Sequence, residues 1–116
     1  MLARDYRLLK KNDFKRVFEQ GTTRRGPVFI LRALSRADAA VSRFGIIVSR
    51  KVSPKAVRRN QIKRCLRAAL TKPLTSFTRP VDLVIIVQVM ASKMTNKQLT
   101  AAFMEMLVKL KPVALK

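Results

Sequence analysis

The residues best suited to chemistry form a run of cations within residues 50–67. This stretch holds eight basic side chains and no acid: Arg50, Lys51, Lys55, Arg58, Arg59, Lys63, Arg64 and Arg67. At about 100° per helical residue, one polar set falls within an arc of roughly 140°: Arg59, Asn60, Lys63, Arg64 and Arg67. Such a surface is suited to phosphate groups, and Asn60 to a hydrogen bond with a sugar or base.

A merely solvated helix face is the alternative explanation. Solvated faces usually mix signs, because opposite charges four residues apart stabilise a helix. Here Lys63 has a cation four residues away on both sides, Arg59 and Arg67, and like pairs cost roughly a few tenths of a kcal/mol each. A bound polyanion would relieve that repulsion, so the pattern favours nucleic-acid binding. No common DNA-binding motif is recognisable. RNA, which is recognised by shape, sugar hydroxyls and stacking, is therefore the expected partner, and DNA is not.

Composition supports this interpretation for the whole chain. The 116 residues include 26 Lys and Arg against 6 Asp and Glu, a net charge of +20 that attracts polyanions. Nucleic acid and anionic membrane surfaces are the candidate partners. A disordered basic tail is disfavoured, because the chain is 48% hydrophobic and such tails lack apolar residues. Its length suits one compact domain.

Several function classes lack the residues they need. The chain has no His, the usual general base near neutral pH. Its single cysteine, Cys65, permits no internal disulfide, and the acids are scattered without an evident pair. We therefore expect no catalytic or metal-ligating residues in the protein. No apolar stretch reaches the roughly 20 residues of a membrane span and no signal peptide is recognisable, so a cytoplasmic location is expected.

The first half of the chain predicts one helix and two strands. Residues 12–20 form the helix, with Asn12 as its N-cap and Gly21 as its terminator. Gly26 and Pro27 mark a turn. Strands are predicted for residues 28–35 and 44–50, where apolar and β-branched residues concentrate.

The second half predicts a helix, a strand and a helix. Pro54 precedes the basic helix at residues 55–70. Residues 81–90 are almost continuously apolar, as in a central strand covered on both faces. Thr95 and Gln98 form a possible capping box for the last helix, which Pro112 closes. This order predicts one small α+β domain with helices packed on a small sheet.

Two sequence segments then resemble a known family. RFGIIVSRKVSPKAVRRNQIKRCLR, residues 43–67, resembles the signature of the bacterial ribonuclease P protein. LLKKNDFKRVFEQG, residues 8–21, is similar to that family's first helix. The resemblance covers roughly residues 7–110. It implies a single domain over residues 1–116, with residues 1–6 and 112–116 as loose ends and a left-handed β-α-β crossover around the basic helix.

The resemblance also implies a function. Members of the family assist a catalytic RNA that removes the 5′ leader of precursor tRNA, and that RNA with its Mg²⁺ performs the chemistry. The implied contacts with the RNA are Arg50, Lys51, Arg58, Arg59, Asn60, Lys63, Arg64 and Arg67. The implied leader-binding cleft involves Phe14, Phe18 and Arg32. The protein alone is expected to be inactive, to bind no cofactor with its own residues and to bind no membrane.

Three departures from the family pattern bear on these implications. Gln61 stands where the second arginine of the motif is expected, and Arg58 is the residue expected to offset that loss. Arg32 replaces an aromatic residue of some relatives, and Ser53–Pro54 alters the entry to the helix. Phe14 and Phe18, at helical spacing, also suit an ordinary core. The alternatives left open are a ribosomal-type RNA-binding protein, a membrane-surface protein and a protein-only nuclease.

Overall fold

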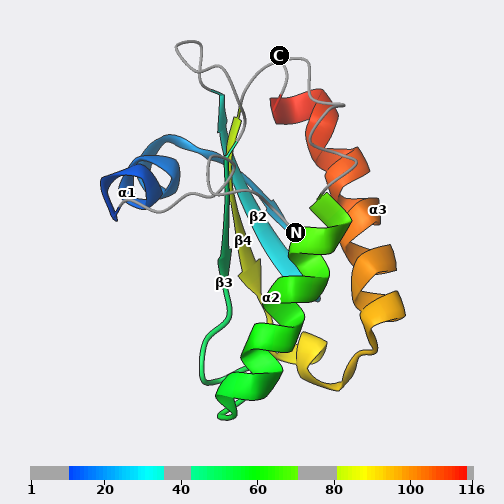
Figure 1. Ribbon diagram of the computed structural model, residues 1–116. Helices are drawn as coiled ribbons and strands as arrows, with labels where there is room; N and C mark the ends of the chain where they lie inside the picture. The colour runs from blue at the N-terminus through cyan, green and yellow to red at the C-terminus, as the bar shows by residue number, and fades with distance from the viewer. Residues whose placement is uncertain (1–10, 36–42, 71–80, 115–116) are drawn as a thin grey trace.

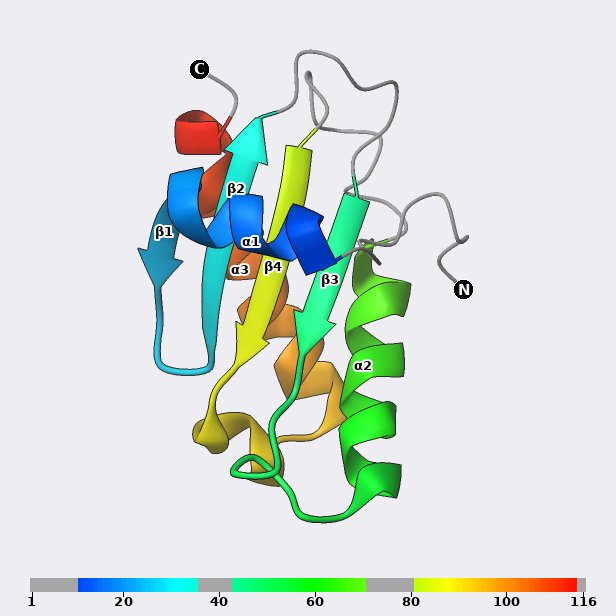
Figure 2. The ribbon, with the colours of Figure 1, turned by 90° about the vertical axis from the view of Figure 1, so that its left-hand side faces the viewer.

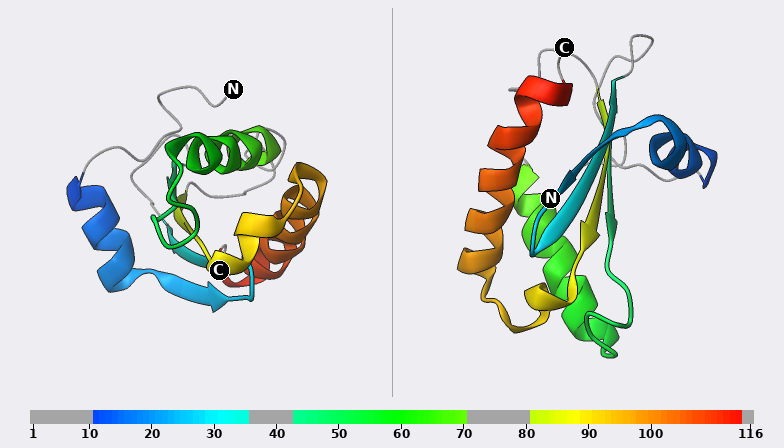
Figure 3. Two further views of the ribbon diagram at one scale, coloured as in Figure 1. Left: turned by 90° about the horizontal axis from the view of Figure 1, so that it is seen from below. Right: turned by 180° about the vertical axis from the view of Figure 1, so that it is seen from behind.

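A four-stranded sheet separates one helix from two others. The computed structural model describes residues 11–35, 43–70 and 81–114. In chain order the elements are α1 (Lys11–Gln20), β1 (Thr22–Arg25), β2 (Phe29–Ser35), β3 (Arg43–Ile47), α2 (Ala56–Leu70), β4 (Val81–Val87), the 3-10 helix η3 (Val89–Lys93) and α3 (Asn96–Ala114). Figure 1 shows α1 on one face of the sheet and α2 and α3 on the other, and Figure 3 shows the same layers from below and behind. No described helix is long and apolar enough to cross a membrane.

The strand order is β1-β2-β4-β3, with β4 in the interior of the sheet. β4 pairs antiparallel with β2 and parallel with β3, while β1 and β2 form an antiparallel hairpin. Six of the seven residues of β4 are buried. The apolar run is therefore a central strand covered on both faces, as its sequence predicts, and the α+β expectation is confirmed.

The connection from β3 through α2 to β4 is left-handed. Figure 2 views the sheet from the side of α1, with α2 behind it. In this view β3 and β4 both descend, α2 rises behind the sheet, and β4 lies to the left of β3. A path that descends in front, rises behind and steps leftward has a left hand. About 98% of such connections are right-handed, so this crossover, which the family resemblance implies, is an uncommon one.

The main core lies between the sheet and the pair α2 and α3. Phe29 of β2 and Phe103 of α3 meet edge to face, with ring centroids 5.7 Å apart. Ile62 and Leu66 of α2 are fully buried in the same cluster. Burial of each such side chain contributes roughly 1.5–3 kcal/mol. This layer fixes α2, so its orientation follows from which of its residues are apolar.

The termini of two helices follow the local sequence. The Thr95 N–H donates to Oε1 of Gln98 at 3.0 Å, and the Gln98 N–H donates to the Thr95 hydroxyl at 3.2 Å. This reciprocal pair is the predicted capping box. Gly21 ends α1, and its N–H donates to the Val17 carbonyl at 2.8 Å. A Cβ at this position would collide with that carbonyl oxygen, so the close approach requires glycine.

Several predicted boundaries differ from those in the structure. Helix α1 begins at Lys11, so Asn12 lies inside its first turn rather than at its N-cap. β3 ends at Ile47, because the chain turns to bury Val48 and Val52. β4 ends at Val87, where β2, its partner, also runs out at Phe29.

Helix α3 continues through Pro112 to Ala114. Proline lacks an N–H donor, but its fixed φ near −65° is compatible with a helix. Residues 112–114 are thus part of the helix. The polar strand β1 was not expected, since TTRR has no apolar alternation. Residues 1–6 lie outside the described residues.

Candidate nucleic-acid interface

The cationic side of α2 faces away from the core. Ile62, Leu66 and Leu70 are buried, whereas Asn60 and Arg64 are exposed. Lys63 and Arg67 are half-buried. The structure therefore brings these four polar residues onto one flank of α2, as the helical spacing predicts.

The turn that precedes α2 extends this charged surface. Arg50 and Lys51 are exposed in the turn, and Lys55 is exposed just before the helix begins. The turn closes through the Val52 N–H, which donates to the Ser49 carbonyl at 3.1 Å. Ser53 is buried, and its hydroxyl accepts the Lys55 N–H at 3.3 Å. The cations of the turn therefore adjoin the cations at the start of α2 and continue the same charged surface.

Arg58 and Arg59 are bound to the protein itself. The Arg58 Nη2 donates to the Met94 carbonyl at 2.7 Å and to the Ser92 carbonyl at 3.4 Å. The Arg59 Nη1 donates to the Ser53 carbonyl at 2.9 Å. These contacts brace the start of α2 against the turn and against the segment before α3. The geometry gives Arg58 a structural role and offers no support for compensation of Gln61.

Replacing Arg58 with alanine is expected to lower the free energy of unfolding by about 1.5–3 kcal/mol, the usual contribution of hydrogen bonds to a charged group. Arg64→Ala is the matched control, because Arg64 is exposed on the same helix and, among the described residues, no hydrogen bond or ion pair joins it to another element; its effect should stay within about 0.5 kcal/mol. Urea unfolding followed by circular dichroism measures both. Equal stabilities of the two variants would contradict the bracing role.

A second surface lies on the opposite face of the sheet, beside α1. Strand register aligns one residue from each strand in a row, with Arg25 paired to Ile30, Ile30 to Ile86, and Ile86 to Ile47. The three isoleucines are half-buried rather than covered. Figure 2 shows α1 crossing this face near one end of the strands, which leaves the other end without a helix over it. We call the aligned set of Arg25, Ile30, Ile86 and Ile47 the isoleucine row.

The predicted leader-binding residues adjoin the isoleucine row. Phe14 is half-buried and packs, like Ile47 and Ile86, against the buried pair of Val17 and Val84. Phe18 is 39% exposed, and the guanidinium carbon of Arg32 lies 5.7 Å from the centroid of its ring. The Arg32 Nη2 also donates to the Phe18 carbonyl. The structure therefore unites all three predicted residues at the edge of one half-exposed apolar surface.

An ion cluster beneath α1 was not identified from the sequence. Arg43 of β3 donates to both carboxylate oxygens of Asp82, at 3.0 and 2.8 Å, and to Asp13 of α1 at 3.1 Å. Asp82 is fully buried and Asp13 nearly so. The hydrogen bonds that Arg43 donates to Asp82 are the main cause that raises the pKa of Arg43, so the cation persists at any physiological pH. The available signal was an aspartate inside the apolar run of β4.

The two surfaces meet at β3. Ile47 is the last residue of β3 and ends the isoleucine row, and Arg50 begins the cationic turn three residues later. The fold and these surfaces define a small α+β RNA-binding protein.

Comparisons with known proteins supply the family. Residues 2–111 match the family described as Ribonuclease P. The ribonuclease P protein component of a Pseudanabaena species is 35% identical over 111 residues, which span 96% of each chain. That of a Synechocystis species is 41% identical over 86 residues, or 74% of this chain and 69% of the relative. The chain belongs to the ribonuclease P protein family.

Solved structures agree with this assignment. The Staphylococcus aureus RNase P protein superposes with a TM-score of 0.81 at 29% identity, over 96% of this chain and 98% of that one. The Thermotoga maritima RNase P protein superposes with a TM-score of 0.77 at 25% identity, over 89% and 96% of the two chains. The resemblance carried by residues 43–67 is confirmed. The chain is accordingly a protein component of ribonuclease P, an endoribonuclease of tRNA processing.

Proposed function

We propose that the chain docks on the catalytic RNA of ribonuclease P through α2 and its preceding turn, and holds the 5′ leader of precursor tRNA on the isoleucine row. The observation that carries this proposal is the alignment of three half-exposed isoleucines beside Phe14, Phe18 and Arg32. Cationic groups beside an aromatic ring on which a base can stack are the arrangement that binds single-stranded nucleic acid, and Phe18 with Arg32 offers both.

Docking on the RNA uses charge rather than base recognition. Arg50, Lys51, Lys55, Lys63 and Arg64 supply cations for phosphate groups, and Arg67 lies on the same flank of α2. Phosphate contacts fix position and orientation without reading sequence. Asn60 adds an exposed amide in the middle of this surface, which is suited to a sugar hydroxyl or a base edge.

Leader binding uses stacking and apolar contact. A base of the leader stacks on the Phe18 ring. Arg32 holds this ring in place, because its Nη2 donates to the Phe18 carbonyl in α1 and its guanidinium lies over the ring. Isoleucine side chains have no hydrogen-bond donors or acceptors, so they do not discriminate between one base and another. This surface therefore suits a substrate class whose leaders differ in sequence.

The chemical step belongs to the RNA in this proposal. The two carboxylates that the fold brings together, Asp13 and Asp82, already share the guanidinium of Arg43. They do not suit a divalent cation, since a cationic side chain occupies the space between them. Mg²⁺ would therefore be held by the RNA, and the protein contributes binding and orientation.

Phe18→Ala tests leader binding. In the assembled ribonucleoprotein this variant should weaken binding of precursor tRNA by about 5- to 150-fold, because stacking contributes roughly 1–3 kcal/mol per base. Binding of mature tRNA, which lacks the leader, should not change. The backbone carbonyl that Arg32 uses remains in the variant, so only the ring is removed.

Val108→Ala is the control, because Val108 is 65% exposed on α3, on the other side of the sheet. It should bind both tRNAs as the unmodified protein does. Equal losses for precursor and mature tRNA in Phe18→Ala would argue against a leader site and for a general effect on assembly.

A further inference from the structure

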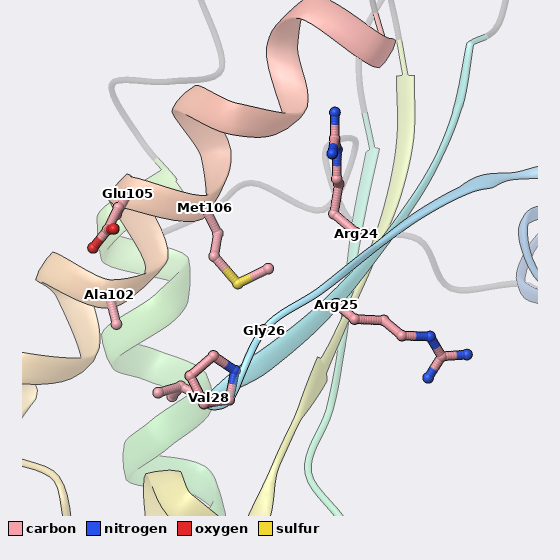
Figure 4. A pocket seen from close by; sticks show the side chains of 8 residues that line it. Arg24, Arg25, Gly26, Val28, Ala102, Glu105 and Met106 are labelled. Carbon is pink, nitrogen blue, oxygen red and sulfur yellow. The ribbon is translucent and has the colours of Figure 1, made fainter.

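Two adjacent arginines of β1 point to opposite faces of the sheet. Arg25 pairs with Ile30 and so shares the face of α1, whereas Arg24 pairs with the buried Leu31 and shares the face of α3. Figure 4 shows the two side chains projecting to opposite sides of β1, with Arg24 on the side of Met106. Alternation along a strand is the cause. Neighbouring residues of the same type thus meet different surroundings.

Arg25 occupies the far end of the isoleucine row. The row begins at Ile47 on β3, crosses β4 and β2, and ends at Arg25 on β1. Three interstrand steps of about 4.8 Å make it about 14 Å long. Stacked nucleotides advance about 3.4 Å each along a strand, so the row accommodates about four of them.

Arg25 is also an uncommitted cation. The other arginines described on this face are occupied, Arg32 by the Phe18 carbonyl and Arg43 by Asp82 and Asp13. Arg25 is exposed, and within the described part of the chain no carboxylate forms an ion pair with it. Guanidinium groups bind phosphate in a bidentate manner. An apolar row that ends in an uncommitted guanidinium suits a single strand of nucleic acid whose bases lie on the row and whose backbone phosphate meets the cation at its end.

We propose that Arg25 binds a phosphate of the leader and marks the distal end of its path, about four nucleotides from the entry at β3. This inference rests on the proposed function, because it takes the isoleucine row as the leader site. The leader enters beside Ile47, since the cationic surface for the catalytic RNA begins there, and leaves the protein at β1. Arg25 therefore acts only on leaders long enough to reach it.

The test measures precursor tRNA affinity of the assembled ribonucleoprotein against leader length, with Arg25→Ala and Arg24→Ala as a matched pair. Arg25→Ala should weaken binding about 3- to 10-fold for leaders of five or more nucleotides and leave leaders of one or two unchanged. It should also lower the log–log salt slope by about one for the long leaders alone. Arg24→Ala should behave as the unmodified protein at every length. An effect of Arg25→Ala that is independent of leader length, or an equal effect of Arg24→Ala, would overturn the inference.

A second measurement locates the phosphate. Single leader linkages are replaced in turn by uncharged methylphosphonate. The unmodified protein should lose affinity mainly at one linkage, near the fourth nucleotide, and Arg25→Ala should be insensitive at that linkage. If Arg25→Ala responds at every linkage as the unmodified protein does, Arg25 does not bind a leader phosphate. Phe18→Ala distinguishes a failure of this inference from a failure of the leader site. If Phe18→Ala weakens binding of precursor tRNA alone and Arg25→Ala has no effect that depends on the leader, only this inference is rejected. If neither variant has an effect that depends on the leader, the leader site itself is rejected.

Discussion

Replacing Arg43 with alanine is expected to lower the free energy of unfolding by about 3–5 kcal/mol, because the change leaves the fully buried Asp82 carboxylate without its cation. The same change releases Asp13 and so removes one of the two polar contacts between α1 and the sheet described above, leaving that of Arg32 with the Phe18 carbonyl. Apolar contacts of α1 are few, with Val17 as its one fully buried apolar residue among those described. Urea denaturation measures the loss of stability.

Arg16→Ala is the control for this experiment. The Arg16 side chain is 45% exposed and lies 3.6 Å from the same Asp13, so its removal should cost less than about 1 kcal/mol. Arg43→Lys should be intermediate, since lysine keeps the charge but loses the bidentate geometry. If Arg43→Ala cost no more than Arg16→Ala, another partner would be compensating Asp82, and the cluster would not be what holds α1.

The salt dependence of RNA affinity should be steep. Five cations of the α2 surface, Arg50, Lys51, Lys55, Lys63 and Arg64, give an expected log–log slope of about −4.5 at roughly −0.9 per neutralised phosphate. Affinity for the catalytic RNA should therefore fall about 500-fold between about 50 and 200 mM salt. Filter binding or fluorescence titration at several salt concentrations measures the slope.

A pair of variants assigns that slope to its residues. Lys63→Ala with Arg64→Ala should reduce the slope by about two, because each removes one phosphate contact. Arg58→Ala should leave the slope unchanged while it lowers stability, since the Arg58 guanidinium is bound to the carbonyls of Ser92 and Met94. A nearly flat salt dependence, or an equal change of slope in Arg58→Ala, would contradict the assignment of Lys63 and Arg64 to phosphate binding and of Arg58 to stability.

Local patterns in the sequence predicted the elements well where contacts between residues close together in the chain determine the structure. The capping box at Thr95 and Gln98 was predicted because its two bonds join residues three apart. The two sides of α2 were predicted because helical periodicity alone separates Leu66 from Arg64. The central position of β4 was predicted because burial on both faces excludes polar residues, with Asp82 as the informative exception.

Contacts between distant segments were beyond these patterns. Arg58 and Arg64 are equivalent cations in the sequence, yet only Arg58 meets backbone carbonyls of the segment before α3. Arg43 and Asp82 are 39 residues apart, and nothing local pairs them. The polar strand β1 has no periodicity of its own and exists because β2 offers it an unpaired edge.

Composition and periodicity were enough to predict a basic α+β domain with a cationic, amphipathic helix, and two segments indicated the ribonuclease P protein family. The contacts between distant segments showed which arginines are bonded within the fold, such as Arg58, and which are exposed, such as Arg64. Only the tertiary structure decided that Ile30, Ile47 and Ile86 form one row with Arg25 at its end. The physical reason is register, because sheet pairing aligns residues from four separate strands, and no periodicity along a single strand encodes that alignment.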